Sequence, residues 1–192
     1  MDYYFSVLSP YTYLAGDELE RIAAKHGATI NYAPINLIRL FGETGGTPPA
    51  KRHPSRQAYR LMELKRISKR SGLPFNLHPA HWPTDFAPAT AALLAAKTTA
   101  EGDLGAATRA LLRAVWAEDK NIADAEVVEA ALREGGFDLA SLDTAAAAAQ
   151  IEPLTDEARE RGVFGAPTYA IGDELFWGQD RLDYLAERLA DS

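Results

Sequence analysis

The apolar positions at the start of the chain predict a strand, a helix and a second strand. Residues 2–7 are rich in aromatic side chains and predict the first strand, and Pro10 suits the first turn of a helix because its missing N–H needs no partner there. Apolar residues recur at helical spacing over residues 11–26, and Gly27 ends that run. Residues 28–35 then alternate like a strand. Short turns on both sides of the helix favour a parallel strand pair with a right-handed crossover.

The middle of the chain predicts a loop and then a series of helices. Residues 42–54 are crowded with Gly, Pro and Thr and predict a loop. Helical periodicity resumes over residues 56–71, where we expect Arg and Lys to face water and apolar side chains to face a core. Those apolar side chains are Tyr59, Met62, Leu64 and Ile67. After a proline-rich segment, further helices are predicted over residues 88–98, 104–118, 125–134 and 139–150.

The end of the chain returns to mixed structure. Thr155 as an N-terminal cap and Gly162 as a stop predict a short helix. Residues 167–171 and 174–177 predict two antiparallel strands joined by a tight turn, and an amphipathic helix begins near Gln179. Neither chain end has enough strands to form a sheet alone. We therefore expect a single α/β domain, with a small mixed sheet built from both ends and the helices inserted between them.

Composition removes several classes of function. The chain has 192 residues, a net charge of −7 and no cysteine. The negative charge argues against a nucleic-acid-binding protein. The absence of cysteine excludes disulfides, thiolate metal sites and cysteine nucleophiles, so any thiol must come from a ligand. No run approaches the roughly 20 apolar residues that span a bilayer, and no secretory signal is visible, so we expect no membrane association and a cytoplasmic location.

Two short segments carry candidate chemistry at predicted junctions. Ser9 lies where the first strand meets the first helix, and the free N–H groups of a helix N-terminus favour an anion such as a thiolate. Taken alone, Ser9 is more often a simple helix cap. Ala166-Pro167 precedes a strand, and a cis bond there would present the Ala166 main chain to an extended peptide ligand. The residues alone favour an ordinary trans bond.

Charged and aromatic residues give weaker signals. Asp180, preceded by Gln179, suits either a ligand ammonium or a helix cap. A group of cations suits carboxylate recognition or an ordinary solvated surface, and it comprises Lys51, Arg52, His53 and Arg56. His78 and His81 lack a third metal ligand at suggestive spacing, so we favour a surface loop and expect no metal. Trp116 and Trp177 are expected in the core.

Motifs at both ends and in the middle of the chain resemble one family. The motifs are Leu8-Ser9-Pro10-Tyr11, residues 44–49 (TGGTPP), Trp116-Ala117-Glu118, residues 121–124 (NIAD), residues 162–168 (GVFGAPT) and residues 177–182 (WGQDRL). Together they resemble the 2-hydroxychromene-2-carboxylate isomerases. That family belongs with the kappa-class glutathione transferases, and both are relatives of the bacterial periplasmic disulfide oxidoreductases. The resemblance spans essentially the whole chain.

The resemblance implies a thioredoxin-like fold with the order βαβ…ββα. The core would comprise residues 1–36 and 153–192, with a large all-helical insertion over residues 37–152. It also implies a homodimer and a bound glutathione.

Roles for individual residues follow from the same resemblance. Ser9 would donate to the glutathione sulfur and hold it as a thiolate, Ala166 before a cis Pro167 would pair with the cysteinyl main chain, and Gln179 and Asp180 would receive the γ-glutamyl end. The remaining glutathione contacts would be Pro10, Tyr11 and, at the glycyl carboxylate, Arg56. Trp82 would lie near an aromatic substrate.

The implied reaction is reversible addition of the thiolate to an unsaturated aromatic 2-oxo acid, bond rotation and expulsion of the thiol, as a step of aromatic catabolism. This would interconvert 2-hydroxychromene-2-carboxylate and trans-o-hydroxybenzylidenepyruvate. Two alternatives remain open: a kappa-like transferase or peroxidase, and a non-catalytic module that binds peptides or proteins. The absent cysteines exclude a disulfide oxidoreductase.

Two positions depart from the family pattern. Relatives usually carry Asn where this chain has Gly46, and often Lys where it has Gly42. The loss of this amide and this lysine indicates either altered substrate choice or replacement of the lysine charge by Lys51 or Arg52 from the adjacent loop.

Overall fold

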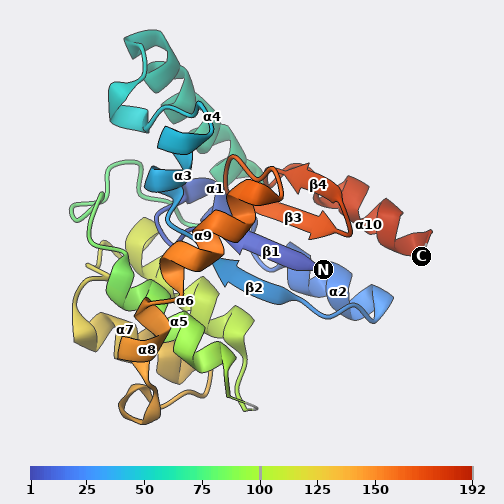
Figure 1. Ribbon diagram of the computed structural model, residues 1–192. Helices are drawn as coiled ribbons and strands as arrows, with labels where there is room; N and C mark the ends of the chain where they lie inside the picture. The colour runs from blue at the N-terminus through green and yellow to red at the C-terminus, as the bar shows by residue number, and fades with distance from the viewer. Residues whose placement is uncertain (100, 192) are drawn as a thin grey trace.

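The chain folds around a mixed sheet whose strands come from both ends of the sequence. The computed structural model describes residues 1–99 and 101–191. The sheet order is β2-β1-β3-β4, formed by β1 (Asp2–Phe5), β2 (Asn31–Pro34), β3 (Thr168–Ile171) and β4 (Glu174–Trp177). β1 pairs in parallel with β2 and antiparallel with β3, so the two ends of the chain meet in the middle of the sheet (Figure 1). The predicted mixed α/β sheet is confirmed.

The helical region between β1 and β2 differs from the prediction. A single helix over residues 11–26 was expected, but α1 (Pro10–Leu14) and α2 (Glu18–His26) are separate. Gly16 lies between them with φ +65°, a left-handed conformation that glycine adopts without the steric cost of a Cβ. The break lets α1 end early and α2 run back along the sheet (Figure 1).

The rest of the chain is helical apart from its connections. The elements are α3 (Leu37–Glu43), η1 (Pro49–Lys51), α4 (Pro54–Ser71), α5 (Ala87–Lys97), α6 (Leu104–Trp116), α7 (Ala125–Glu134), η2 (Leu139–Ser141), α8 (Thr144–Ala148), α9 (Ile151–Glu160) and α10 (Leu182–Ala190). The single helix predicted over residues 139–150 is wrong, because that stretch holds two short elements instead. The division into a core and an insertion between residues 37 and 152 stays a prediction.

Thr155 has a different role from the predicted cap. It lies inside α9, where its hydroxyl donates to the Ile151 carbonyl oxygen at 2.8 Å and accepts from the Asn36 N–H at 3.0 Å. The fully buried hydroxyl therefore joins α9 to the segment that follows β2.

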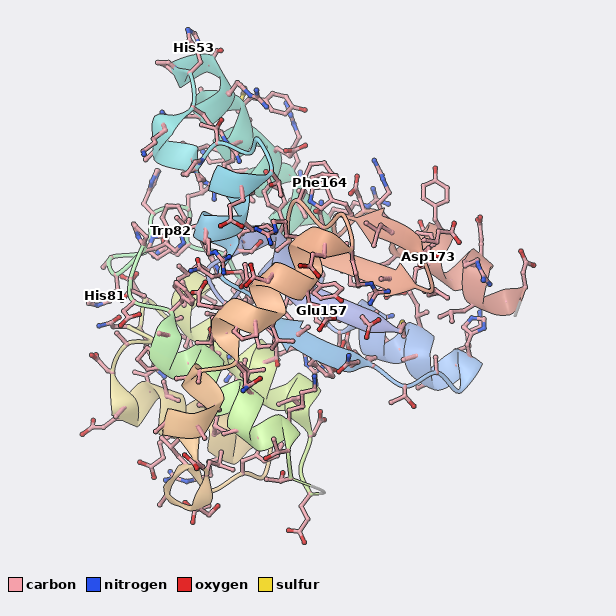
Figure 2. The ribbon with its side chains drawn as sticks, in the orientation of Figure 1. His53, His81, Trp82, Glu157, Phe164 and Asp173 are labelled. Carbon is pink, nitrogen blue, oxygen red and sulfur yellow. The ribbon has the colours of Figure 1, made fainter. Side chains whose placement is uncertain are left out.

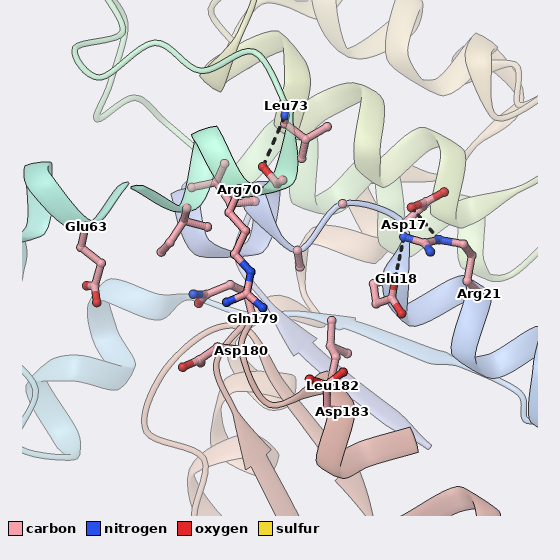
Figure 3. Close-up of a pocket in the computed structure, with 15 residues that line it drawn as sticks. Asp17, Glu18, Arg21, Glu63, Arg70, Leu73, Gln179, Asp180, Leu182 and Asp183 are labelled. Carbon is pink, nitrogen blue, oxygen red and sulfur yellow. Dashed lines mark hydrogen bonds and ion pairs between the residues drawn. The ribbon is translucent and has the colours of Figure 1, made fainter. Parts of the chain in front are cut away.

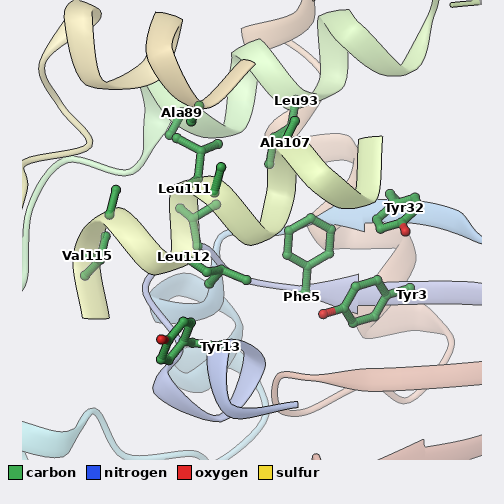
Figure 4. Packing of buried hydrophobic residues seen from close by; sticks show 14 of the residues in the cluster. Tyr3, Phe5, Tyr13, Tyr32, Ala89, Leu93, Ala107, Leu111, Leu112 and Val115 are labelled. Carbon is green, nitrogen blue, oxygen red and sulfur yellow. The ribbon is translucent and has the colours of Figure 1, made fainter. Parts of the chain in front are cut away.

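The two faces of the sheet are covered by different helices. Tyr3, Tyr32 and Tyr169 share one face and pack in the main core with residues of α6, as Figure 4 shows for Tyr3 and Tyr32 beside Leu111 and Leu112. The opposite face carries Tyr4, Ala33 and Ala170 and lies against α9. Burying one large apolar side chain contributes about 1.5–3 kcal/mol, so this alternation fixes which side of the sheet each helix covers.

α4 projects from the body of the protein, with His53 at its N-terminal end (Figure 2). Leu64 is fully buried, but Tyr59 and Met62 are 53% and 48% exposed, so the prediction that they face a core is wrong. Their helical spacing is correct, yet the projecting part of α4 offers them no neighbouring element to pack against. Within the described residues, no helix is long and apolar enough to cross a membrane.

Candidate functional site

Ser9 caps α1 and contacts a distant loop at the same time. Its Oγ accepts a hydrogen bond from the Thr12 N–H at 3.2 Å, which confirms the helix-cap interpretation. The same hydroxyl donates to the main-chain carbonyl oxygen of Ala166 at 3.2 Å. Ser9 is only 3% exposed, and Pro10 follows it as the first residue of the helix. The buried hydroxyl thus lies between a helix N-terminus and the loop that precedes β3.

The loop opposite Ser9 contains a cis bond between Ala166 and Pro167. The trans bond that the residues alone favoured is therefore wrong, and the form implied by the family resemblance is present. The Pro167 carbonyl oxygen accepts from the Gly178 N–H at 2.9 Å, and the Thr168 hydroxyl donates to the Gly165 carbonyl oxygen at 2.8 Å. The Ala166 N–H makes no hydrogen bond with any residue that the structure describes. An unsatisfied main-chain donor therefore lies beside Ser9.

A cavity of about 450 Å³ opens next to Ala166. Four segments form its walls: α1, the α3–α4 arm, the cis-proline loop and the turn between β4 and α10. The lining residues are Tyr11, Phe41, Gly45, Gly46, Thr47, Arg52, Arg56, Glu63, Phe164, Gly165, Ala166, Trp177, Gly178, Gln179, Asp180 and Arg181. The structure thus brings together six residues predicted from the sequence: Tyr11, Arg52, Arg56, Ala166, Gln179 and Asp180.

Both signs of charge occur on two walls of this cavity: Arg52, Arg56 and Glu63 on one, and Asp180 and Arg181 on the other. Arg52 is held by its Nε, which donates to the Thr47 carbonyl oxygen at 2.7 Å. Arg56 makes no ion pair with any described residue. Asp180 contacts Arg181 at 2.9 Å, and α10 has no side-chain cap within the described part of the chain, so the cap interpretation of Asp180 is wrong. Arg56 and Asp180 lie on different walls, and a ligand that carries both charges could contact both.

Tyr11 adds a neutral donor to the same wall. Its hydroxyl donates to Glu63 Oε2 at 3.2 Å. Burial and the neighbouring Glu63 carboxylate raise the pKa of Tyr11 to about 12. The phenol therefore stays protonated at neutral pH.

Two exposed aromatic side chains border the cavity. The Phe164 and Trp177 rings meet edge to face with centroids 4.7 Å apart, and they are 43% and 51% exposed. The expectation that Trp177 belongs to the core is wrong, whereas Trp116 is 1% exposed and does. Trp177 pairs with Thr168 at the end of β4, directly after the cis-proline loop in the neighbouring strand.

The two glycines that depart from the family pattern have different surroundings. Gly46 lines the cavity, and a Cβ built on it would lie 2.5 Å from Cδ1 of Phe41. Phe41 therefore fills the space that a side chain at position 46 would need, and the Arg52 guanidinium lies 5.9 Å from the centre of its ring. Gly42 is exposed and has nothing within 4 Å of a built Cβ.

The other predicted residues lie outside the cavity wall. Lys51 is exposed in η1. Trp82 lies in the connection before α5, and its Nε1 donates to the Leu8 carbonyl oxygen at 3.0 Å, immediately before Ser9. His78 and His81 are exposed, and the described residues contain no cluster of His, Cys, Asp and Glu that could hold a metal ion.

A larger cavity of about 690 Å³ lies on the other side of the β4–α10 turn (Figure 3). It shares Glu63, Gln179 and Asp180 with the smaller one, but Ala166 and Arg56 are not part of its wall. Charged side chains surround it, and among them Arg21 pairs with Asp17 and Glu18. We assign the candidate site to the smaller cavity, because only that one contacts the loop that Ser9 touches.

The comparisons with known proteins agree with this geometry. The DSBA-like thioredoxin domain family matches residues 1–190. The chain is 33% identical to the 2-hydroxychromene-2-carboxylate isomerase of Pseudomonas putida, covering 96% of this chain and 91% of that protein.

More distant relatives extend the comparison. The human protein glutathione S-transferase kappa 1 is 25% identical over 100% of this chain and 91% of its own length. A solved structure of a 2-hydroxychromene-2-carboxylate isomerase has a TM-score of 0.79 and 29% identity, covering 99% of this chain and 94% of the other. The chain therefore belongs to the DSBA-like thioredoxin domain family and to the 2-hydroxychromene-2-carboxylate isomerase family.

Proposed function

We propose that this protein is a glutathione-dependent isomerase that interconverts 2-hydroxychromene-2-carboxylate and trans-o-hydroxybenzylidenepyruvate. One observation carries the proposal: the Ser9 hydroxyl, at a helix N-terminus, lies 3.2 Å from the main chain of Ala166, which lines a cavity suited to a small peptide. The names of the relatives at 27–33% identity support the substrate and the reaction type.

The groups around the cavity fit glutathione. The unsatisfied Ala166 N–H and its carbonyl oxygen would pair with the cysteinyl main chain. Asp180 would receive the γ-glutamyl ammonium, with Gln179 beside it, and Arg56 would bind the glycyl carboxylate. Pro10 and Pro167 would shape the two turns on either side of the sulfur. An acidic group on one wall and an unpaired guanidinium on the other match the zwitterionic ends of this tripeptide.

Ser9 would change its hydrogen-bond partner when the tripeptide binds. In the free protein its proton points to the Ala166 carbonyl oxygen. If a ligand N–H occupies that carbonyl, the hydroxyl proton is free to turn toward a sulfur above the helix N-terminus. A donor and the helix dipole together favour the thiolate over the thiol, which lowers the thiol pKa.

When bound, glutathione would supply a nucleophilic thiolate for reversible addition to the unsaturated 2-oxo acid, which forms when the ring C2–O bond of the hemiketal breaks to give a ketone and a phenol. Rotation about the bond made single and expulsion of the same thiolate would then restore the double bond in the trans form. Ser9 holds the sulfur during both steps. The aromatic surfaces near the site, Trp82 and the Phe164–Trp177 pair, would receive the substrate ring, and cations on α4 would face its carboxylate. Because the thiolate is regenerated, glutathione is not consumed.

The proposal is tested by following 2-hydroxychromene-2-carboxylate spectroscopically with and without glutathione. We expect conversion that depends on glutathione and leaves the thiol concentration unchanged. Stoichiometric loss of thiol with an electrophilic aromatic acceptor would indicate a kappa-like transferase instead. Lack of turnover with every aromatic 2-oxo acid tried would indicate that the protein is a non-catalytic binding module.

We also propose that the protein acts as a homodimer in the cytoplasm. Light scattering of the purified chain tests the dimer, and cell fractionation tests the location.

A further inference from the structure

Arg60 stands out among the cations near the site because it is partly buried and its guanidinium makes neither a hydrogen bond nor an ion pair with any described residue. It lies one turn after Arg56 on α4 and is partly buried. Its guanidinium carbon lies 5.5 Å from the centre of the Trp82 ring. Beyond this ring contact, its side chain has no hydrogen bond or ion pair to any residue in the described ranges.

Other partly buried arginines in the described residues have a polar partner. Arg39, Arg109 and Arg161 each contact at least one carboxylate, and Arg52 donates to the Thr47 carbonyl oxygen. A contact with an aromatic face attracts a guanidinium but leaves its charge intact. A partly desolvated cation without a counter-charge costs free energy in the empty protein, and an anionic ligand would remove that cost.

The surroundings of Arg60 keep its charge available. Tyr11 is the acidic group that interacts electrostatically with Arg60, and its phenol is uncharged at neutral pH. Burial lowers the pKa of Arg60, and repulsion by the positive charge of Arg52 lowers it further. The guanidinium still stays protonated, as arginine does in proteins. Glu63, one turn further along α4, contacts the Tyr11 hydroxyl instead.

Trp82 links Arg60 to the segment that leads into Ser9. The indole Nε1 is bonded to the Leu8 carbonyl oxygen, one residue before Ser9, and the indole lies 5.6 Å from the buried Trp116 ring. The ring is therefore held against the main chain that leads into Ser9, and the Arg60 guanidinium lies over that ring.

We propose that Arg60 is the specificity-determining residue that binds the carboxylate of the aromatic acid, while the ring of that acid lies against Trp82. The proposal rests on the isomerase function proposed above and names the residue that selects acids. It assigns to Arg60 the role expected for Lys51, because Lys51 is exposed and a solvated cation gains less from an anion. A guanidinium binds a carboxylate through two parallel hydrogen bonds, which fixes the orientation of the acid over Ser9.

The test compares an acid with its neutral counterpart. Arg60→Met keeps much of the side-chain volume over Trp82 and removes the charge, and Arg60→Lys restores a charge without the two-pronged geometry. We expect Arg60→Met to raise KM for 2-hydroxychromene-2-carboxylate roughly 10- to 100-fold and to change KM for the corresponding primary amide by less than about twofold. Arg60→Lys should recover part of the loss. Lys65→Met, at an exposed position of the same helix, is the matched control.

Direct binding separates this proposal from the isomerase function. Calorimetry with cinnamate and with cinnamamide measures carboxylate recognition without turnover, and calorimetry with glutathione checks the neighbouring site. Loss of cinnamate binding in Arg60→Met with glutathione affinity retained supports the proposal, even if no variant isomerises the chromene acid. Equal losses for acid and amide, or an unchanged KM for the acid, would overturn it.

Discussion

The hydroxyl of Ser9 and the carbonyl oxygen of Ala166 are hydrogen-bonded at 3.2 Å although 157 positions separate them in the chain. The contact exists because β1, which leads into Ser9, is paired with β3, which follows Ala166. It places a hydroxyl donor, a helix N-terminus and a free main-chain N–H around one point. The chemistry proposed here depends on that convergence.

Removing the Ser9 hydroxyl should affect both rate and stability. Hydrogen bonds to charged groups contribute about 1.5–3 kcal/mol, so Ser9→Ala should lower turnover at neutral pH roughly 10- to 100-fold. The ultraviolet absorbance of the bound thiolate should appear at higher pH than in the wild type. Loss of the helix cap should cost about 1 kcal/mol of unfolding free energy.

Asp103→Ala is the control for that stability loss, because Asp103 caps α6 by accepting from the Ala106 N–H at 2.9 Å. The Asp103→Ala protein should lose a similar amount of unfolding free energy and keep its activity. A Ser9→Ala protein with the wild-type rate and thiolate titration would show that Ser9 is only a cap.

Asp180 should recognise the ammonium group of glutathione. Asp180→Asn should weaken glutathione binding about tenfold, or about 1.4 kcal/mol, as measured by calorimetry. The dipeptide cysteinylglycine lacks the γ-glutamyl group and should bind more weakly than glutathione. Its affinity should be equal for the wild type and for Asp180→Asn.

Asp183→Asn offers a matched control, since Asp183 lines the larger cavity but not the smaller one. If the dipeptide loses as much affinity as glutathione in Asp180→Asn, the assignment of Asp180 to the ammonium is wrong.

Gly165 leaves room for Trp177 at the cavity edge. A Cβ at position 165 would lie 2.3 Å from Nε1 of Trp177, so Gly165→Ala must displace the indole. Overpacking of this kind costs about 1–3 kcal/mol. We expect a lower melting temperature and a loss of glutathione affinity of about tenfold or more.

Gly42→Ala provides the comparison, because a Cβ there meets nothing within 4 Å and the residue lies in α3. It should be neutral or stabilising by up to about 1 kcal/mol. Unchanged glutathione binding in Gly165→Ala would mean that the position of Trp177 does not matter to the site.

Asp2 should make stability depend on pH. Burial tends to raise its pKa, but hydrogen bonds from Arg161 at 2.5 Å and Asn31 at 2.6 Å outweigh this and lower the pKa of the Asp2 carboxyl. A carboxyl with a lowered pKa in the folded state stabilises the protein above its unfolded pKa of about 3.9, and that stabilisation is lost as the pH falls through the folded value.

Asp2→Asn should therefore melt about 2–4 °C below the wild type at neutral pH, and the difference should shrink below about pH 4. Glu129→Gln breaks an exposed pair with Arg133 and should change the melting temperature little at any pH. A difference for Asp2→Asn that persists in strong acid would show that the effect is not due to the carboxylate charge.

Much of the local structure could be predicted from the sequence. The order of strands and helices, the cap at Ser9 and the need for a thiol from a ligand follow from periodicity, turn residues and the absence of cysteine. Some of the errors fall where a neighbour that is distant in sequence decides the outcome. Thr155, which was expected to cap a helix, lies within α9 and binds the distant Asn36 N–H, whereas the break at Gly16 is local and comes from the left-handed conformation of that residue.

The site depended more strongly on tertiary structure. Ser9, Ala166, Gln179 and Asp180 could be named from motifs, but their convergence required the pairing of β1 with β3. Trp177 and Arg60 could not be placed from their residue types. An aromatic residue at a strand end is buried only if another element covers it, and an arginine on a helix is solvated only if nothing packs beside it. The sequence alone thus determined which elements form and which chemistry is possible, while packing decided that an indole would be exposed at the cavity and that a cation would lie unpaired over Trp82.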